Sequence, residues 1–240
     1  MIQLSVVIIT FNEEKRIENC LKSVEDLADE IIVVDSYSTD KTREICERYG
    51  VHFIQRKWTN FGDAKRYAVG KASFDYILSL DADEVLSKTL HESIQMTKEN
   101  WTADAYNFNR LNHVGKQAVH RGGWYPDCKI RLFDRRKANW KNIPVHEYVV
   151  PTVNDCKIIW LQGDLFHYSF ANIEGLRKSS KLALYARMYE KKKKLFKPFL
   201  YLKAGFRFFQ IYLLNLGFLD GKVGLEIAKA RTRYVIQKYS

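Results

Sequence analysis

The sequence has few cysteines, and their spacing suits neither metal ligation nor disulfide bridges. The 240 residues contain Cys20, Cys46, Cys128 and Cys156, without a Cys-x-x-Cys pair. This scatter argues against a zinc cluster and a disulfide framework and fits a reducing compartment. The first ten residues lack the basic stretch that opens a secretory signal and instead have the pattern of a strand. We therefore expect a cytoplasmic protein.

Long apolar runs and glycine-rich phosphate loops are also missing. The longest uncharged run near the C-terminus, residues 208–219, has 12 residues, whereas a membrane-spanning helix needs about 20. The first strand–helix turn, TFNEEK, contains neither GxGxxG nor GxxxxGK[ST]. A dinucleotide-dependent dehydrogenase and a P-loop NTPase are therefore disfavoured. There are no internal repeats, and low complexity is limited to residues 191–194.

The first half of the chain alternates strand and helix patterns. Apolar runs rich in β-branched residues predict buried strands over Leu4–Thr10, Glu30–Asp35, 51–55 and 76–80. Between and after them, helical spacing and cap residues predict helices over 14–24, 38–49, 62–71 and 87–99. This order predicts an α/β fold, with a mostly parallel sheet flanked by helices on both faces.

The pattern changes after about residue 103. Short strand-like runs over 105–111, 129–133 and 157–160 alternate with Gly, Pro and Asn turns, which predicts an antiparallel addition to the sheet. From residue 172 the chain is expected to be helical. We therefore predict a catalytic domain over 1–170, with a nucleotide-binding half (1–100) and an acceptor-side half (101–170), followed by a basic helical tail over 171–240.

Acidic residues follow directly after the fourth predicted strand, in the sequence Asp81-Ala82-Asp83-Glu84. Two aspartates one residue apart can direct oxygens at one hard cation, and Mg²⁺ or Mn²⁺ would in turn bridge the phosphates of a nucleotide. The alternative is that these acids only favour the N-terminus of the following helix. An isolated Asp-x-Asp does not separate the two.

Polar residues also follow the first two strands, which raises the case for a site. Thr10, Asn12, Glu13 and Asp35 are expected at the same sheet edge as Asp81, because ligands of parallel sheets lie beyond the carboxyl ends of the strands. Asn12 or Glu13 alone would more often be a helix cap. Lys65 and Arg66 open the preceding helix and could meet a diphosphate; otherwise they form a solvated pair.

Four motifs in order, SVVIITFNE, IIVVDSYSTD, GDAKRYA and LSLDADE, resemble the donor-binding half of family 2 glycosyltransferases of GT-A fold. Within that family they are similar to the lipopolysaccharide-core glucosyltransferase-like branch. The resemblance implies a hexosyltransferase that uses a nucleotide sugar, with UDP-hexose as the expected donor, and a divalent metal, Mn²⁺ or Mg²⁺. The four motifs together are specific for this family over residues 4–84, and the resemblance is looser beyond residue 84.

The resemblance also implies roles for individual residues. It assigns the base and ribose of the nucleoside to the first two strand ends, with a lysine nearby, and the ribose and metal to the Asp-x-Asp motif. Arg121-Gly122-Gly123-Trp124 resembles the glycine loop beside the donor sugar, and Leu165–Ser169 resembles the segment whose histidine completes the metal site. The donor residues are then Thr10, Asn12, Glu13, Asp35, Lys65, Asp81 and Trp124, and the metal ligands Asp81, Asp83 and His167.

The catalytic base has two candidates. Pro144-Val145-His146-Glu147 lies where the family carries an acidic pair whose last member is the base, although here the pair is His-Glu rather than Glu-Asp. Glu147 is therefore the first candidate, and Asp127, in Tyr-Pro-Asp before a strand, is the second; Asp127 could equally be a turn residue. Single displacement of the diphosphate would invert the anomeric configuration, with one carboxylate taking the acceptor's proton.

Positive charge is concentrated in the tail. Residues 175–210 contain eleven Lys or Arg and one Glu, so this stretch carries +10 of the net charge of +11. Six apolar residues recur at helical spacing and predict one stripe of an amphipathic helix: Phe199, Leu202, Phe206, Phe209, Leu213 and Leu216. A cationic, aromatic helix predicts an anchor on anionic lipid through residues 175–216, peripheral on the inner face of the cell membrane. Alternatively the stripe packs on protein.

Three further functions remain alternatives. The first is transfer of the sugar to polyprenyl phosphate instead of a glycan hydroxyl. A tail without spanning helices does not distinguish these two acceptors. A nucleotidyltransferase would need a glycine-rich loop after the first strand, and none is present. A nucleic-acid-binding protein could use the basic tail, but would leave Asp35, Asp81 and Asp83 without a role, so we expect no nucleic acid partner. The oligomeric state is open.

Overall fold

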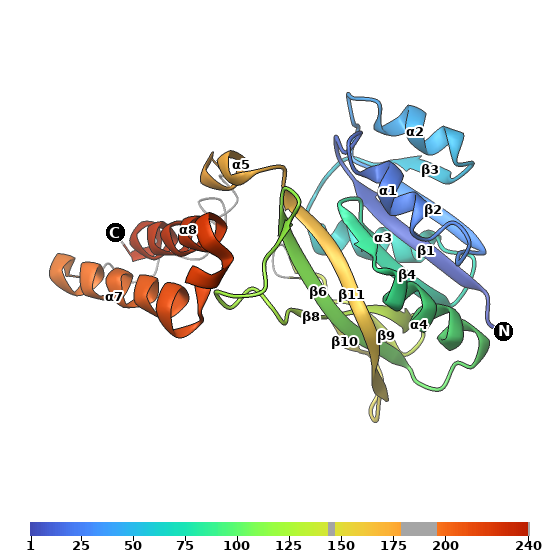
Figure 1. Cartoon of the computed structure of the whole chain (residues 1–240). Helices are drawn as coiled ribbons and strands as arrows, with labels where there is room; N and C mark the ends of the chain where they lie inside the picture. Colours follow the sequence, from blue (N-terminus) through green and yellow to red (C-terminus); the bar gives the residue numbers. More distant parts are fainter. Residues whose placement is uncertain (144–146, 179–195, 240) are drawn as a thin grey trace. The chain divides into compact units, whose positions relative to one another are not determined.

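The computed structural model describes residues 1–143, 147–178 and 196–239. Its contacts form two compact units (Figure 1). The first unit comprises Met1–Arg110 and Cys128–His167, and the second comprises Leu111–Asp127 and Tyr168–Ser240. The predicted catalytic domain over 1–170 and tail over 171–240 stay a prediction; by contacts, Leu111–Asp127 groups with the C-terminal helices.

Four parallel strands form one half of the main sheet. They are β1 (Leu4–Thr10), β2 (Glu30–Asp35), β3 (His52–Gln55) and β4 (Tyr76–Asp81), in the spatial order β3-β2-β1-β4. The predicted strands 51–55 and 76–80 are thus confirmed to within one residue. All seven residues of β1 are buried, as expected for a central parallel strand covered on both faces.

The other half of the sheet contains antiparallel pairs. From β4 the order continues through β8 (Cys128–Asp134), β6 (Ala105–Val114), β11 (Ile158–Phe170) and β5 (Glu84–Leu86). Strand β8 is antiparallel to both β4 and β6, and β5 is antiparallel to β11. The starts of β6 and β11 are joined by a bond from the Asp104 amide to the Lys157 carbonyl, and their ends by one from the Gly115 amide to the Phe170 carbonyl, so these two strands run in the same direction. The predicted fold class, a mostly parallel sheet flanked by helices, is therefore confirmed. Strand β11 is also longer than the predicted 157–160.

Helices cover both faces of the first unit's sheet. One face of β1 packs on α1 (Ile17–Lys22), α2 (Thr42–Arg48) and α4 (Lys88–Glu99). The opposite face packs on α3 (Phe61–Lys71) and on a small sheet of β9 (Ala138–Trp140) and β10 (Val149–Pro151). Successive residues of β1 point to opposite faces, so Val6 enters one core and Val7 the other, as the two-residue period of a strand requires.

Helix caps explain where α3 and α4 begin. The side chain of Asn60 accepts a hydrogen bond from the Asp63 amide, and that of Ser87 accepts one from the Leu90 amide. Each cap satisfies a donor that the first helical turn leaves without an intrahelical partner. Because β1, β2 and β4 are parallel, the turns that follow them lie at one edge of the sheet.

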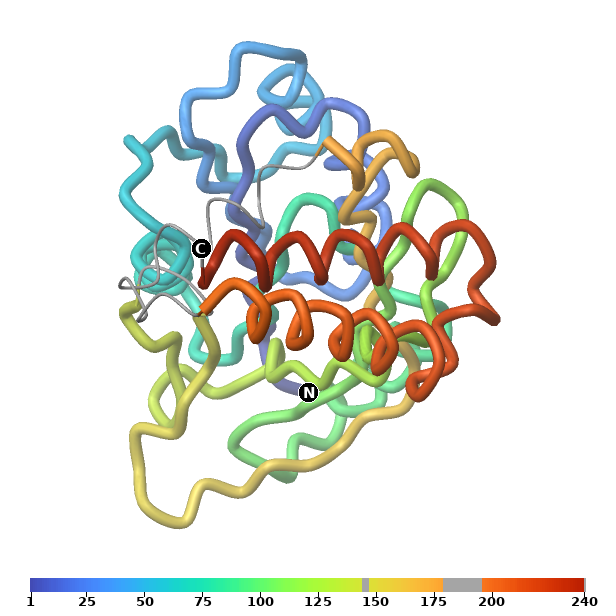
Figure 2. The backbone as a smooth tube through the Cα atoms, turned by 90° about the vertical axis from the view of Figure 1, so that its left-hand side faces the viewer, coloured from blue at the N-terminus to red at the C-terminus, as the bar shows by residue number. Residues whose placement is uncertain are grey.

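The second unit contains the strand β7 (Gln117–Ala118), which pairs with β6, and the C-terminal helices. These are α5 (Ile173–Lys178), α7 (Lys197–Phe209), the π-helical turn η1 (Gln210–Leu214), the 3₁₀ turn η2 (Gly217–Asp220) and α8 (Gly221–Tyr239). Helices α7 and α8 lie side by side (Figure 2). Their core includes Ile211, Val223 and Ile227, packed against Val119 and Leu176.

The predicted apolar stripe does not lie on one continuous helix. Helix α7 ends at Phe209, and the backbone of Leu216 turns into the left-handed region with φ of 55°. Gly217 permits this turn, because a Cβ there would lie 2.6 Å from the Ile211 carbonyl oxygen. Part of the predicted basic segment, including Lys191–Lys194, lies outside the described residues. In the described ranges no helix is both long and apolar enough to cross a bilayer.

Candidate active site

The strand register brings three predicted site residues to one edge of the first unit. Thr10 is paired with Asp35 across β1 and β2, and Ile9 is paired with Asp81 across β1 and β4. Because the strands are parallel, these residues end their strands at the same level. This is the edge at which open α/β sheets bind ligands.

A buried network of charges surrounds Asp81. Lys65 of α3, only 1% exposed, places Nζ 2.9 Å from Asp81 Oδ1. Arg131 of β8 places its NH2 3.0 Å from Asp81 Oδ2 and 2.8 Å from Glu84 Oε1. Glu84 in turn accepts the Asp81 amide at 3.0 Å. Two cations and two carboxylates therefore neutralise one another where little water reaches.

Electrostatics at Asp81 favour its ionised form. Burial alone would raise the pKa of this carboxyl, but the positive charges of Lys65 and Arg131 outweigh burial and hold the pKa well below its usual range. Burial likewise works against the charge of Arg131, whereas Glu84 and Asp81 raise its pKa above the ordinary value. Trp140 covers both cations, with its ring centroid 4.5 Å from Lys65 Nζ and 5.0 Å from Arg131 Cζ.

Glu147 joins this network through Lys65. Its Oε1 accepts a hydrogen bond from Lys65 Nζ at 2.9 Å, and its side chain is 16% exposed. The segment before it closes tightly on α3, since a Cβ at Gly62 would lie 2.6 Å from the Ile143 carbonyl oxygen. The three preceding residues of the predicted motif, 144–146, lie outside the described residues. The first candidate base thus lies beside the end of β4.

Asp83 and His167 approach each other across the turn that follows β4. His167 Nε2 lies 3.5 Å from Asp83 Oδ2, and the two side chains are 16% and 13% exposed. The antiparallel pairing of β5 with β11 sets His167 opposite Glu84. Gly163, with φ of 97°, lets β11 pass the start of α4, where a Cβ would lie 2.3 Å from the Leu90 nitrogen. Two predicted metal ligands from distant segments are therefore adjacent.

The two predicted nucleoside loops are tied to each other. Asn12 Oδ1 accepts the Thr39 amide at 2.8 Å, and the Asn12 amide donates to Ser38 Oγ at 2.8 Å. Asp35 is fully buried, and its carboxylate accepts the Ser38 amide at 2.9 Å and the Ser38 hydroxyl. In this arrangement Asn12 and Asp35 fix the loop that would border a nucleoside.

Glu13 and Thr10 differ in what their side chains contact. Glu13 Oε2 forms an ion pair with Arg16 at 2.7 Å at the start of α1. The Thr10 hydroxyl is buried and has no hydrogen-bond partner among the described residues. Because a buried hydroxyl without a partner costs free energy, Thr10 Oγ1 is a polar atom that a bound ligand could satisfy.

Two predicted residues, Trp124 and Asp127, belong to the second unit. The Trp124 carbonyl accepts a hydrogen bond from Asn112 at 3.4 Å, and its ring lies 6.3 Å from that of Phe170. Gly122 and Gly123 before it have φ of 67° and 73°, which suits the predicted glycine loop. The structure describes both residues within that unit, and their roles at the donor site stay predictions.

Sequence reasoning missed Arg131 and Trp140. Arg131 lies within the predicted strand 129–133 between the apolar Ile130 and Leu132, and this position is the only signal the sequence offers. Its partners Asp81 and Glu84 are about fifty residues earlier, so only the pairing of β8 with β4 reveals them. A buried Arg in a strand beside an acidic strand end indicates an ion network.

An α/β sheet whose carboxyl edge gathers acids, cations and a histidine is the arrangement of a nucleotide-binding enzyme. Sequence comparison specifies the class. The chain belongs to glycosyl transferase family 2, whose profile matches residues 5–151. The structure accordingly has the GT-A architecture expected for that family.

Relatives support the same family. An uncharacterized glycosyltransferase of Rickettsia bellii is 34% identical over 187 residues, which cover 72% of this chain and 62% of the relative. The glycosyltransferase SunS of Bacillus subtilis is 45% identical over 84 residues, 34% of this chain and 20% of SunS. The matched region thus spans less than two thirds of the length of the rickettsial relative.

Among solved structures, S. aureus TarS 1–349 in complex with UDP is similar with a TM-score of 0.49 and 17% identity, over 73% of this chain and 63% of TarS. Glucosyl-3-phosphoglycerate synthase of Mycobacterium tuberculosis, crystallised with Mn²⁺ and UDP-glucose, has a TM-score of 0.39 and 22% identity over 47% of this chain and 44% of that one.

Proposed function

We propose that this chain is an inverting, metal-dependent hexosyltransferase that uses a nucleoside-diphosphate sugar, with UDP-hexose as the donor. The observation that carries the proposal is the grouping of Asp83 with His167 and of Asp81 with Lys65 and Glu147 around the end of β4. These groups can bind a cation, a diphosphate and an acceptor hydroxyl at one place.

The residues present fit a divalent ion. Asp83 and His167 offer a carboxylate oxygen and an imidazole nitrogen 3.5 Å apart. Asp81 Oδ1 is buried and accepts no hydrogen bond of good geometry from the described residues, although Lys65 Nζ is near. No group of three or more acidic, His or Cys side chains in the described ranges is arranged to hold an ion. A site with few protein ligands suits Mg²⁺ or Mn²⁺, which take their remaining ligands from substrate phosphates and water.

When bound, the ion would offset the negative charge of the departing diphosphate. Asp83 and His167 would hold it. Asp81, whose charge is already balanced by Lys65 and Arg131, is better placed to accept a hydrogen bond from the ribose than to be the main ligand. Thr10 Oγ1 is buried and has no hydrogen-bond partner in the described part of the chain, so it would form a hydrogen bond with the nucleoside.

Glu147 is the proposed general base. Lys65 bonds only its Oε1, so in the described residues Oε2 has no hydrogen-bond partner and can take the acceptor's proton. As that proton moves to Oε2, the acceptor oxygen forms a bond to the anomeric carbon, and the bond from that carbon to the diphosphate oxygen breaks with its electron pair. Attack from the opposite side inverts the configuration. Asp127 is the second candidate base.

A lipid-linked surface glycan, such as lipopolysaccharide core, is the proposed acceptor, with polyprenyl phosphate as the alternative. The support is the stripe along α7, η1 and the turn at Leu216, whose six residues are between 41% and 69% exposed. Exposed apolar side chains beside cations favour attachment to an anionic membrane. We accordingly propose a peripheral position on the inner face of the cell membrane.

Nucleotide release tests the proposal. The protein is incubated with UDP-hexoses and membrane glycolipid, with Mn²⁺, with Mg²⁺ or with chelator, and free UDP is measured. We expect metal-dependent release with one donor, lost in Asp83→Asn and retained in the exposed control Glu92→Gln. If no UDP-, GDP- or dTDP-sugar yields nucleotide with either metal, and none raises the melting temperature, the proposal is wrong.

A further inference from the structure

A cationic groove separates α7 from α8 in the second unit. Its volume is about 340 Å³, and its walls are residues of α7, η1 and α8: Lys203, Phe206, Arg207, Gln210, Arg231, Tyr234, Val235, Lys238 and Tyr239. Four of these side chains are positively charged, and none is acidic. A groove of this composition is suited to an anion.

The acids of this segment are engaged elsewhere. Residues 196–239 contain only Asp220 and Glu226. Asp220 accepts the Arg121 amide at 2.9 Å, and Glu226 pairs with Arg177 at 2.9 Å and Lys229 at 3.2 Å. Neither lines the groove. In the described residues, therefore, the positive charge of the groove is not neutralised by its own helices.

Arg231 shows this imbalance most clearly. Its guanidinium is partly buried and forms no hydrogen bond or ion pair with the described residues. Burial lowers the pKa of Arg231, and the positive charge of Arg207 lowers it further. Among the described residues, the partner of Arg207 is the neutral Gln210 Oε1, at 2.8 Å. Two guanidinium groups placed near each other without a carboxylate would be stabilised by a shared anion.

The other polar groups of the groove suit a phosphate. Lys203 Nζ lies 4.0 Å from the centroid of the Tyr239 ring, and Lys238 Nζ lies 3.4 Å from the Tyr234 hydroxyl. Guanidinium groups match the oxygens of a phosphate two at a time, and ammonium and phenol groups add single donors. Cations from two helices can thus surround one phosphate group.

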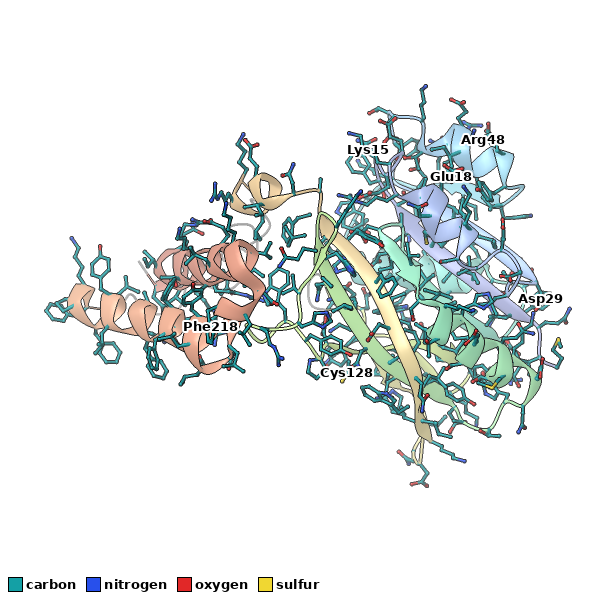
Figure 3. All side chains as sticks on the ribbon, viewed as in Figure 1. Lys15, Glu18, Asp29, Arg48, Cys128 and Phe218 are labelled. Atoms are coloured by element: carbon teal, nitrogen blue, oxygen red, sulfur yellow. The ribbon has the colours of Figure 1, made fainter. Side chains whose placement is uncertain are left out.

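The surroundings of the groove indicate a lipid as the source of that phosphate. Phe206 lines the groove and is also a member of the exposed apolar stripe, being 60% exposed. Aromatic rings project from α7 on the side away from α8, and Phe218 is exposed on the turn that joins the two helices (Figure 3). Apolar side chains beside a phosphate site are the arrangement by which an interfacial helix meets a lipid head group.

We propose that the groove between α7 and α8 binds the phosphate of an anionic membrane lipid while the stripe of α7 enters the interface. The inference rests on the membrane association proposed above and gives it a specific site. It predicts that vesicle binding depends on which cations are removed, and not only on how many.

The test is sedimentation of the full chain with vesicles of phosphatidylcholine, with and without phosphatidylglycerol. Arg207→Gln/Arg231→Gln removes two groove cations, and the control Lys222→Gln/Arg233→Gln removes two exposed cations of α8 that do not line the groove. We expect the groove variant to bind phosphatidylglycerol vesicles about 30-fold more weakly and the control to change by less than about threefold. Melting curves check folding, and Lys203→Gln/Lys238→Gln replaces the groove variant if it unfolds.

The outcomes separate this inference from the membrane proposal. Equal losses in groove and control variants would mean diffuse attraction and overturn the site alone. No binding to either vesicle, with metal-dependent UDP release intact, would overturn membrane association and the site but leave the transferase. Inorganic phosphate that stabilises the wild type through Arg207 and Arg231, without any groove dependence of vesicle binding, would overturn the lipid as its source.

Discussion

The first unit buries charged groups, whereas the second exposes apolar ones. In the first, Lys65, Glu84 and Arg131 are at most 2% exposed; Lys65 and Arg131 both pair with Asp81, and Arg131 also pairs with Glu84. In the second, Phe199 and Leu202 of α7 are 56% and 69% exposed. Buried charge is costly unless paired, and clustered exposed apolar surface is uncommon on a monomer that contacts only water. The buried charges of the first unit and the exposed apolar side chains of the second are thus both features that stability alone does not explain.

Each unit should therefore respond to its own kind of substitution. Substitutions at the buried ions should affect chemistry and folding, and substitutions on the stripe should affect neither.

The largest effect is expected for Glu147→Gln. The amide keeps an oxygen for Lys65 but cannot take the acceptor's proton, so turnover should fall about 10²- to 10⁴-fold. Steady-state UDP release measures it, with Glu92→Gln as the exposed control. Asp127→Asn, measured in parallel, decides between the two candidate bases: the base is Asp127 if that variant loses turnover and Glu147→Gln does not.

Arg131→Met should be the most destabilising change among the ions. It leaves Asp81 and Glu84 buried without a shared cation, and breaking such a network costs about 3–5 kcal/mol. Urea unfolding measures the loss. Arg43→Met breaks only an exposed pair with Glu47 and should cost about 0.5 kcal/mol or less. Similar losses at the two positions would show that the buried network contributes no special stability.

The stripe and the core of α7 can be compared at neighbouring positions. Leu200 is 4% exposed and Leu202 is 69% exposed. Leu200→Ala should cost about 2–5 kcal/mol of unfolding free energy, whereas Leu202→Ala should stay within about 0.5 kcal/mol and instead weaken binding to vesicles. A large stability loss at Leu202 would contradict its exposed position.

Metal affinity should fall by at least about tenfold in His167→Ala. In the proposed site the imidazole, with Nε2 3.5 Å from Asp83 Oδ2, would be the nitrogen ligand. Titration of Mn²⁺ in the presence of UDP measures the affinity. The control is His91→Ala, which removes a histidine of α4 that pairs with Asp26. Unchanged affinity in His167→Ala would remove His167 from the metal site.

How far the sequence predicts this protein depends on the range of the interactions. β1 and β2 were predicted at their observed bounds because a buried parallel strand is a continuous β-branched run. The approach of Asp83 to His167, 84 residues apart along the chain, could be inferred only from the family resemblance. Arg131 could not be predicted, since its role depends on which strand lies next to β4.

The C-terminal helices show the same limit. The spacing of Phe199 to Leu216 predicted one apolar face, and all six residues do share an exposed character. The break at Leu216 and the grouping of Leu111–Asp127 with these helices depend on tertiary packing. The groove between α7 and α8 was likewise not predicted, because its cations come from two helices that the sequence does not pair.

The position of the metal is the most direct test of the account. A crystal grown with MnCl₂ and UDP, measured at a wavelength where manganese scatters anomalously, locates the ion and the nucleotide together. We predict an anomalous peak within bonding distance of Asp83 and His167, with the uridine beside Thr10 and Asp35. A peak elsewhere, or UDP bound away from the carboxyl ends of β1, β2 and β4, would contradict the assignment of this edge as the active site.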